Sequence, residues 1–431
     1  MENGIIHYRK LFPWLNIFRA LRIAADPRKL LLATFAYLLL AGGNYLIEQL
    51  PFAPAKNSPL QKTETLNKES QVKEQPVNFP SSSYWGKFQP SVCYFLTGSR
   101  SPFNPLLTVI KPVSRLFQKR ATITDVTFSV TQIFWALTIW AIFGGAICRM
   151  TALRFARDER ISMKRALQFS SRRFLSYFSA PLLPLSGVVC MWLLLFIAGW
   201  IGNIPAVGSV VVGVFYGLAF LIALGIGLIL LGVTCGWSLM QATISVEDSD
   251  AFDGFSRSFS YVFSKPWHFI WYLLVALLFG GIAVEVVSFV ASIVINIAAQ
   301  GLSTGMNEER LTALLGESQF LLKQNPLDWN PLHAGLPMAT WFAVAWHYLA
   351  GLMVFCFRDS YFWVATTIIY FLLRRAEDAT DFDEIHIPAG ETPDEFLPLV
   401  GVAASDQPVI ERPHVDNKNE GSEKAEESSE K

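Results

Sequence analysis

Residues 128–147, FSVTQIFWALTIWAIFGGAI, decide the fold class of this chain. The stretch contains no charged side chain, and about 20 apolar helical residues cross the roughly 30 Å hydrocarbon layer of a bilayer. A strand of a membrane β-barrel would instead alternate apolar and polar residues over about ten positions. The stretch therefore predicts a transmembrane α-helix.

The composition of the whole chain supports the same class. Of 431 residues, 52% are hydrophobic and 16% are charged, against about 25% charged in ordinary soluble domains. We therefore predict an all-α, polytopic helical membrane protein with about six transmembrane helices. The predicted spans are residues 30–48, 128–147, 179–202, 209–236, 267–299 and 338–375.

Four segments lie outside these spans. Residues 1–29 are predicted to contain an interfacial helix anchored by Trp14. Residues 49–127 should form an extracytoplasmic loop, partly disordered, with short surface elements or a loose loop over 82–119. Residues 300–337 are predicted to be an extracytoplasmic amphipathic segment. Residues 376–431 carry 16 acidic and 4 basic residues and are expected to be a mostly disordered cytoplasmic tail.

The distribution of Lys and Arg predicts the orientation. Basic residues flank the first span on its N-terminal side, fill the connection at 149–173 and follow the last span at Arg374 and Arg375. With six spans all three places share one side, which the positive-inside rule identifies as the cytoplasm. Both termini are then cytoplasmic. The basic leader is long for a signal peptide, so the first span is interpreted as a retained anchor.

The central region, 128–299, contains an internal repeat. Apolar and small residues recur with the spacing 3-4-4-4 in two connecting segments, at a constant offset of 89. The two sets are Met163, Ala166, Ser170, Phe174, Phe178 and Phe252, Phe255, Phe259, Phe263, Trp267. This pattern predicts two parallel copies of a unit made of a span, a surface helix and a second span.

The acidic residues in SVEDSDAFDGFSRSFSYVFSKPW, 245–267, are interpreted as structural. Asp250 or Ser249 can cap the second surface helix, and Asp253 meets the positive end of its dipole. Lys265 and Pro266 should end that helix.

The same stretch resembles the membrane domain that is fused to some bacterial glycerophosphoryl diester phosphodiesterases and that also occurs alone. The similarity covers about 150–385. The resemblance implies a bacterial inner-membrane protein. It does not imply the phosphodiesterase activity, because no soluble segment approaches the roughly 250 residues of a catalytic TIM barrel. The matching residues are Glu247, Ala251, Arg257, Ser258 and Trp267, followed by Tyr370 and Arg374 near the end of the last span.

Three charged residues lie inside predicted spans, where an ionisable group is a functional candidate. They are Glu285 in the fifth span and Arg358 and Asp359 in the sixth. Their similar depth predicts an ion pair between Glu285 and Arg358. Neighbours in a helix do not face each other, so Asp359 is expected to need another partner. A polar substrate or proton pathway is the alternative to structural pairing.

Other candidate residues are interpreted as structural. The cysteines form no C-x-x-C motif, and His347 is interpreted as a hydrogen-bonded core residue, so we expect no metal site and no cofactor. Gly213 and Gly217 form a GxxxG motif that would allow close helix packing.

The sequence contains no recognised catalytic motif and predicts no enzyme. The leading hypothesis is a non-enzymatic membrane-organising or assembly component. A transporter or lipid-handling protein with a polar pocket near Glu285, Arg358 and Asp359 is the alternative. The expected partners are membrane lipids and other membrane proteins, with no nucleic acid; the oligomeric state is left open.

Overall fold

The computed structural model describes residues 12–51, 101–116, 122–205, 208–305 and 338–386. Within these ranges the chain forms helices and no β-strand, so the predicted all-α class is confirmed. Most of the predicted outer segments at 49–127 and 300–337, and the tail after His386, lie outside the described residues.

Within the described residues, six helices are long and apolar enough to cross a membrane, by length and composition. They confirm a polytopic helical membrane protein. These candidate spans are Pro27–Glu48, Ile123–Ala156, Phe174–Gly202, Tyr216–Glu247, Pro266–Ser303 and Tyr348–Asp378.

Several of these spans consist of more than one element, and short helices connect them. The long elements are α3 (Pro27–Glu48), α7 (Ile123–Ile139), α8 (Gly145–Ala156), α11 (Leu182–Gly202), α13 (Tyr216–Glu247), α15 (Pro266–Ser303) and α17 (Met338–Asp378). The short ones are the 3₁₀-helix η1 (Pro13–Phe18), α2 (Arg19–Ala24), α6 (Asn104–Leu116), the π-helical turn η3 (Trp140–Gly144), α9 (Met163–Arg172), α10 (Phe174–Ser179), α12 (Gly208–Val214) and α14 (Ala251–Ser264).

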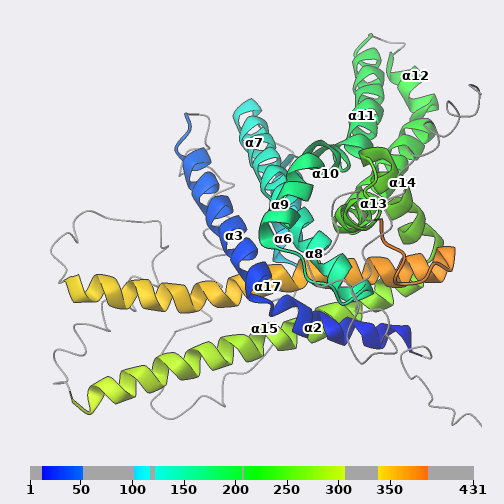
Figure 1. Ribbon diagram of the computed structural model, residues 1–431. Helices are drawn as coiled ribbons and strands as arrows, with labels where there is room; N and C mark the ends of the chain where they lie inside the picture. The colour runs from blue at the N-terminus through cyan, green and yellow to red at the C-terminus, as the bar shows by residue number, and fades with distance from the viewer. Residues whose placement is uncertain (1–11, 52–100, 117–121, 206–207, 306–337, 387–431) are drawn as a thin grey trace, which may run out of the picture. The chain divides into compact units, whose positions relative to one another are not determined.

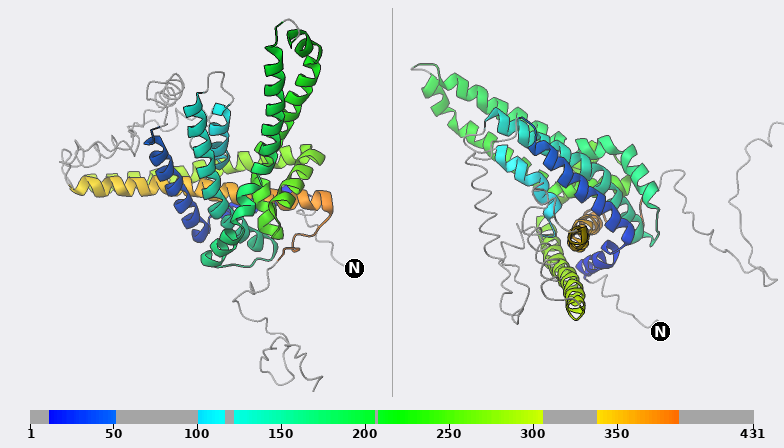
Figure 2. Two further views of the ribbon diagram at one scale, coloured as in Figure 1. Left: turned by 90° about the horizontal axis from the view of Figure 1, so that it is seen from above. Right: turned by 90° about the vertical axis from the view of Figure 1, so that its left-hand side faces the viewer.

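Helix α17 lies at the centre of the packing. In its candidate span 83% of the most apolar window is buried inside the protein. It contacts α3, α8, α13 and α15, and Figures 1 and 2 show α15 beside it while α3 crosses it. The ring of Trp363 on α17 lies 5.4 Å from Trp140 and 5.5 Å from Trp237, between ring centroids. Aromatic side chains from three spans therefore fill the core.

The second and fourth spans are longer than predicted. The second continues through α8 to Ala156 rather than ending at 147, and the fourth continues to Glu247 rather than ending at 236. Their additional turns are buried against the rest of the protein. Neighbouring helices, rather than lipid, therefore cover these turns, and hydrophobicity alone could not find where they end.

The two predicted surface helices exist as α9–α10 and α14. Asp250 caps α14 by accepting a hydrogen bond from the backbone N–H of Asp253 at 2.9 Å, as predicted. Lys265 ends this helix and Pro266 begins α15, also as predicted. The first copy differs because it is interrupted at Arg173. The order of span, short helix and span occurs twice, while equivalence of the two copies in space stays a prediction.

The N-terminal segment is helical, and one of its faces packs on the protein, whereas its interfacial position stays a prediction. Ile17, Ala20 and Ala24 are buried, and Phe18 and Leu21 are 41% and 37% exposed. The buried face of η1 and α2 contacts α17 and η1 also contacts α15. The protein interior, rather than lipid alone, therefore selects the buried face of this segment.

Part of the predicted outer loop also belongs to the bundle. Helix α6 packs against α7, and Thr108 accepts a hydrogen bond from the indole N–H of Trp140 at 3.1 Å. The ring of Phe103 lies 5.7 Å from that of Phe362. Within 101–116 the expected short element is therefore present as α6 and packs on the bundle, whereas its position at the outer membrane surface stays a prediction.

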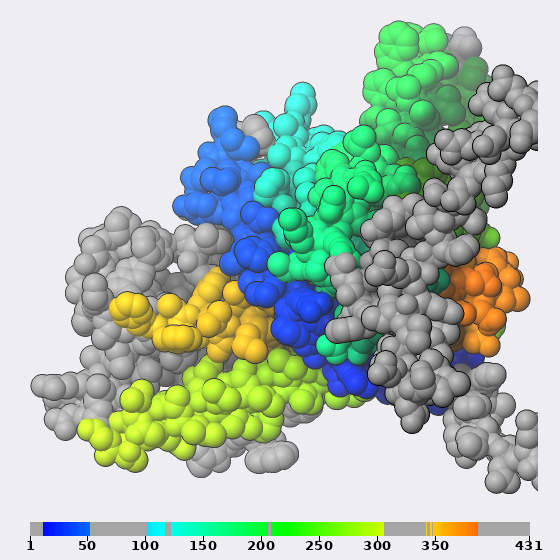
Figure 3. Space-filling model, viewed as in Figure 1, coloured from blue at the N-terminus to red at the C-terminus, as the bar shows by residue number. Residues whose placement is uncertain are grey.

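Helices α11 and α13 form a hairpin with α12 at its tip, and this tip projects beyond the other helices in Figures 1 and 3. Only 11% of the most apolar window is buried in each of the two spans. At Gly213 and Gly217, a Cβ would meet no described heavy atom within 4 Å. The GxxxG motif therefore makes no close helix contact within the described chain, contrary to the prediction.

Candidate functional site

Arg358 and Asp359 lie in the packed interior, with side chains that are 2% and 1% exposed. The Nε–H of Arg358 donates a hydrogen bond to Oδ1 of Asp359 at 2.7 Å. The expectation that these neighbours could not pair was wrong. The flexible arginine side chain bends toward the next residue, because a buried charge without a counter-charge is costly.

Glu285 lies on α15, which runs antiparallel to α17 (Figure 1). The hydroxyl of Tyr361 donates to the carbonyl of Ala276 at 2.9 Å, and its ring packs over Gly280. This register places Arg358 within about one helical turn of Glu285. The register is compatible with the Glu285–Arg358 ion pair, which stays a prediction.

A second set of charges converges where α13, α14 and α17 meet. The carboxylate of Glu247 accepts a hydrogen bond from the hydroxyl of Tyr370 at 2.5 Å. It also forms ion pairs with Arg257, at 2.5 Å between Nη1 and Oε2, and with Arg374, at 3.3 Å between Nε and Oε1. Arg257 further binds Asp253 on its own helix at 2.9 Å. Four of the residues on which the resemblance to the phosphodiesterase-associated domain rests therefore form one network: Glu247, Arg257, Tyr370 and Arg374.

Asp248 extends this charged region toward the first surface helix. Its backbone is in the left-handed region, with φ of 53°, and this conformation ends α13. Its carboxylate binds Nε of Arg173 at 2.6 Å and lies 3.8 Å from Nε2 of His386. The acidic stretch therefore holds three segments together, in addition to capping α14.

Arg173 and Arg257 stay charged. The hydrogen bond to Asp248 raises the pKa of Arg173. Partial burial acts to lower the pKa of Arg257, but its hydrogen bond to Asp253 and the charge of Glu247 outweigh that effect and raise it. The guanidinium groups therefore exchange no proton near neutral pH, and their role in the network is to hold helix ends together.

Arg149 is a buried residue that the sequence reasoning missed, because it was counted among the basic flanks of the second span. Its side chain is fully buried in α8. Nη1 donates to the carbonyl of Ser245 at 2.9 Å, and Nη2 donates to that of His386 at 3.0 Å. The guanidinium also lies 4.4 Å from the ring centroid of Phe169. Nothing in its sequence position distinguishes it from an exposed flanking arginine.

The tryptophan core includes a polar side chain, Gln241, which is 1% exposed. Among the described residues, neither polar atom of its amide has a hydrogen-bond partner, and the same holds for the indole N–H groups of Trp237 and Trp363. A Cβ at Gly144 would lie 2.8 Å from the Trp363 ring and 3.1 Å from the Gln241 oxygen. The absence of a side chain at Gly144 therefore permits this close packing.

The described part of the chain contains no group of three or more His, Cys, Asp or Glu side chains placed to hold a metal ion. Cys148, Cys190, Cys235 and Cys356 are free thiols, whereas Cys93 and the side chain of His347 lie outside the described residues. That the protein uses no metal and no cofactor stays a prediction.

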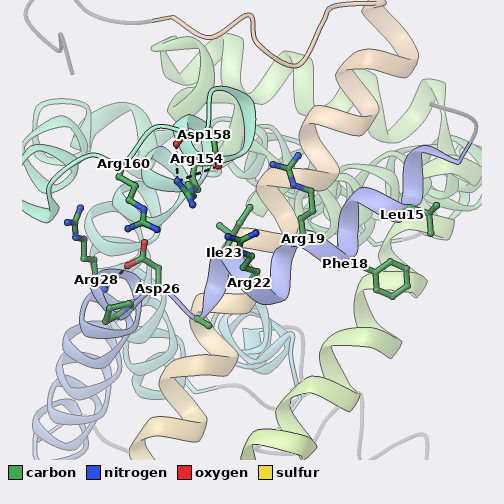
Figure 4. A pocket seen from close by; sticks show the side chains of 12 residues that line it. Leu15, Phe18, Arg19, Arg22, Ile23, Asp26, Arg28, Arg154, Asp158 and Arg160 are labelled. Atoms are coloured by element: carbon green, nitrogen blue, oxygen red, sulfur yellow. Dashed lines mark hydrogen bonds and ion pairs between the residues drawn. The ribbon is translucent and has the colours of Figure 1, made fainter. Parts of the chain in front are cut away.

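A pocket of about 660 Å³ opens between the N-terminal helices and the end of α8. Residues of η1, α2 and the start of α3 form one wall, and the other wall is the last turn of α8 with the loop after it (Figure 4). Its charged lining comprises the aspartates Asp26 and Asp158 and the arginines Arg19, Arg22, Arg28, Arg154 and Arg160. Neither Glu285, Arg358 nor Asp359 lines it.

The fold and these sites define a polytopic helical membrane protein whose interior charges are held in local networks. Comparisons with protein-family models, with curated proteins and with solved structures give no match. The relation to the phosphodiesterase-associated membrane domain therefore stays a prediction.

Proposed function

We propose that this chain is a non-enzymatic membrane-organising or assembly component of a bacterial inner membrane. The observation that carries the proposal is the α11–α13 hairpin, whose spans are covered over only 11% of their most apolar windows. Large side chains on it are open to the surroundings, including Trp200 at 74% and Leu221 at 61% exposure. The bundle fills its own core without these surfaces, so they are available to lipids and to other membrane proteins.

The intramembrane charges also favour this function over transport. A carrier needs its charged groups to line a space that a substrate can enter. Arg358 and Asp359 bind each other in a packed environment, and the arginine-lined pocket contains neither of them. These features support a structural role for the pair.

Site-specific photo-crosslinking in intact membranes tests the proposal. A photoreactive amino acid would replace Leu221 on the hairpin, and matched variants would carry it at Leu38, an exposed residue of α3. A membrane-organising component should give discrete protein adducts of defined mass from Leu221. If Leu221 gives only lipid adducts while the purified protein moves a solute across vesicles, the proposal is wrong.

The proposed orientation has its own test. With both termini in the cytoplasm, a cysteine replacing the exposed Lys164 in the first turn of α9 should resist a membrane-impermeant maleimide in intact cells. It should react after the membrane is permeabilised. Labelling at that position in intact cells would contradict the six-span orientation.

A further inference from the structure

The arginine-lined pocket lies at the N-terminal end of α3, where the first candidate span begins. The end of a span lies near the headgroup layer of the bilayer, so a ligand of this pocket would share its depth with lipid phosphates. The volume of about 660 Å³ is within the range of small-molecule sites, about 300–1,000 Å³.

The charge of the pocket is suited to an anion. Five arginines against two aspartates give a formal charge of +3, and both carboxylates are already engaged. Asp26 accepts a hydrogen bond from the backbone N–H of Arg28 at 3.1 Å, and Asp158 pairs with Arg154 at 3.4 Å. Both aspartates therefore stabilise the wall of the pocket through contacts within it.

Two of the arginines are open to a ligand. Arg22 and Arg160 are exposed, and within the described ranges neither makes a hydrogen bond or ion pair, as Figure 4 shows for the residues drawn there. The flat guanidinium group binds phosphate oxygens through two parallel N–H donors. Arg22 on α2 and Arg160 in the loop after α8 both line the pocket, so each wall supplies a guanidinium group to a ligand held between them.

An apolar stripe continues from the pocket along the first span. Arg28 lines the pocket, and Leu31, Phe35 and Leu38 follow it at helical spacing on one face of α3. These three side chains are 51%, 51% and 44% exposed. A ligand with a charged head and a hydrocarbon chain would therefore contact both surfaces, which a soluble phosphate would not.

We propose that this pocket binds the phosphate headgroup of an anionic glycerophospholipid, with an acyl chain along the exposed face of α3. The group that the pocket recognises is a phosphate ester. The apolar stripe on α3 indicates that this phosphate belongs to a membrane lipid and not to a soluble molecule. The inference is independent of the proposed function, because a specific lipid site can occur in an assembly component and in a carrier.

Native mass spectrometry of the full-length, delipidated protein in detergent tests the site. The probes are dioleoyl-phosphatidylglycerol, which is anionic, and dioleoyl-phosphatidylcholine, which is neutral overall. The test variant carries Arg22→Gln and Arg160→Gln. The control variant, Lys164→Gln with Arg172→Gln, removes two exposed charges of the same kind outside the pocket.

The wild type and the control should prefer phosphatidylglycerol, and the pocket variant should bind it about tenfold more weakly, because hydrogen bonds to charged groups are lost. Equal loss in both variants would show diffuse electrostatic attraction and overturn the site. No preference for the anionic lipid in the wild type would also overturn it. If glycerol 3-phosphate at millimolar concentration displaced the lipid and bound as tightly alone, the pocket would be a soluble-phosphate site.

A photoactivatable phosphatidylglycerol bound to the wild-type protein provides a measurement that does not depend on the folding of the variant. Peptide mapping should place its acyl-chain adduct on the α3 segment containing Leu31 and Phe35. Adducts confined to the other candidate spans would contradict the proposed site.

Discussion

The contact between α15 and α17 predicts a strong effect of one added methyl group. In Gly280→Ala the new Cβ would overlap Cε1 of Tyr361 and lie 2.9 Å from two further ring atoms. The ring cannot easily move, because Tyr361 is 1% exposed and its hydroxyl is bonded to Ala276. The substitution therefore has to separate the helices or displace a buried, hydrogen-bonded side chain.

The magnitude follows from two costs and one opposing gain. Overpacking a filled core costs about 1–3 kcal/mol, and displacing the phenol adds the loss of a hydrogen bond, about 1 kcal/mol. Replacing glycine by alanine within a helix returns up to about 1 kcal/mol. We therefore expect Gly280→Ala to lower the free energy of unfolding by about 2 kcal/mol.

Equilibrium unfolding of the purified chain in mixed micelles, followed by far-ultraviolet circular dichroism, measures this change. Gly301→Ala is the matched control, because Gly301 lies on the same helix and a Cβ there meets nothing within 4 Å. The control should be as stable as the wild type or slightly more stable. Combining Gly280→Ala with Tyr361→Leu should cost less than the sum of the single changes. If Gly280→Ala is as stable as its control, the described helix contact is incorrect.

Three further predictions concern charges and pH. Glu247→Ala should lower the free energy of unfolding by about 2 kcal/mol, since it removes the carboxylate that Arg257, Arg374 and the Tyr370 hydroxyl share. In the double variant, Arg257→Ala should not add its full cost, and strict additivity would argue against the network. Glu285→Arg and Arg358→Glu should each destabilise the protein, and the double reversal should recover part of the loss in the same unfolding assay; no recovery would rule out that pair. Burial, with the hydrogen bond to Asp378, raises the pKa of Tyr261 in the folded protein. The neutral Tyr261 therefore stabilises the fold fully below the ordinary tyrosine pKa of about 10. This stabilisation declines above that pH, because the tyrosine of the unfolded chain ionises first. The stability difference between wild type and Tyr261→Phe should therefore shrink from about pH 9 to about pH 11, whereas a pH-independent difference would contradict the assignment.

The spans could be predicted from sequence because each contains one continuous run of mostly apolar residues. The run at 128–147 contains no charge, and it lies within a candidate span of the structure. The cap at Asp250 was equally accessible, because it involves residues three positions apart. Local patterns of this kind need no knowledge of the tertiary fold.

The charged networks could not be predicted because their partners are distant in the chain. Glu247 meets Arg374 across 127 positions, and the register of α15 against α17 is needed before such a contact can be inferred. The prediction for Arg149 was wrong for a different reason. Its sequence position is that of an exposed flanking residue, but neighbouring helices bury its side chain. The Arg358–Asp359 pair shows that spacing rules for exposed helix surfaces do not govern two charges that are enclosed together.

The π-helical turn at Trp140–Gly144 has a consequence for changes in chain length. The hydroxyl of Ser170 lies 2.7 Å from the carbonyls of both Ala141 and Ile142, so the wider turn is where α9 is fastened to the second span. A π-helical turn holds about one residue more than an α-helical turn, so deleting one residue there would restore ordinary helical geometry with little rotation of the residues that follow. A deletion in the α-helical parts of the second span would instead rotate everything after it by about 100°, and Arg149 would face away from the carbonyls of Ser245 and His386 that it now binds. A one-residue deletion should therefore be tolerated better in this turn than elsewhere in the span, at the cost of the Ser170 contacts.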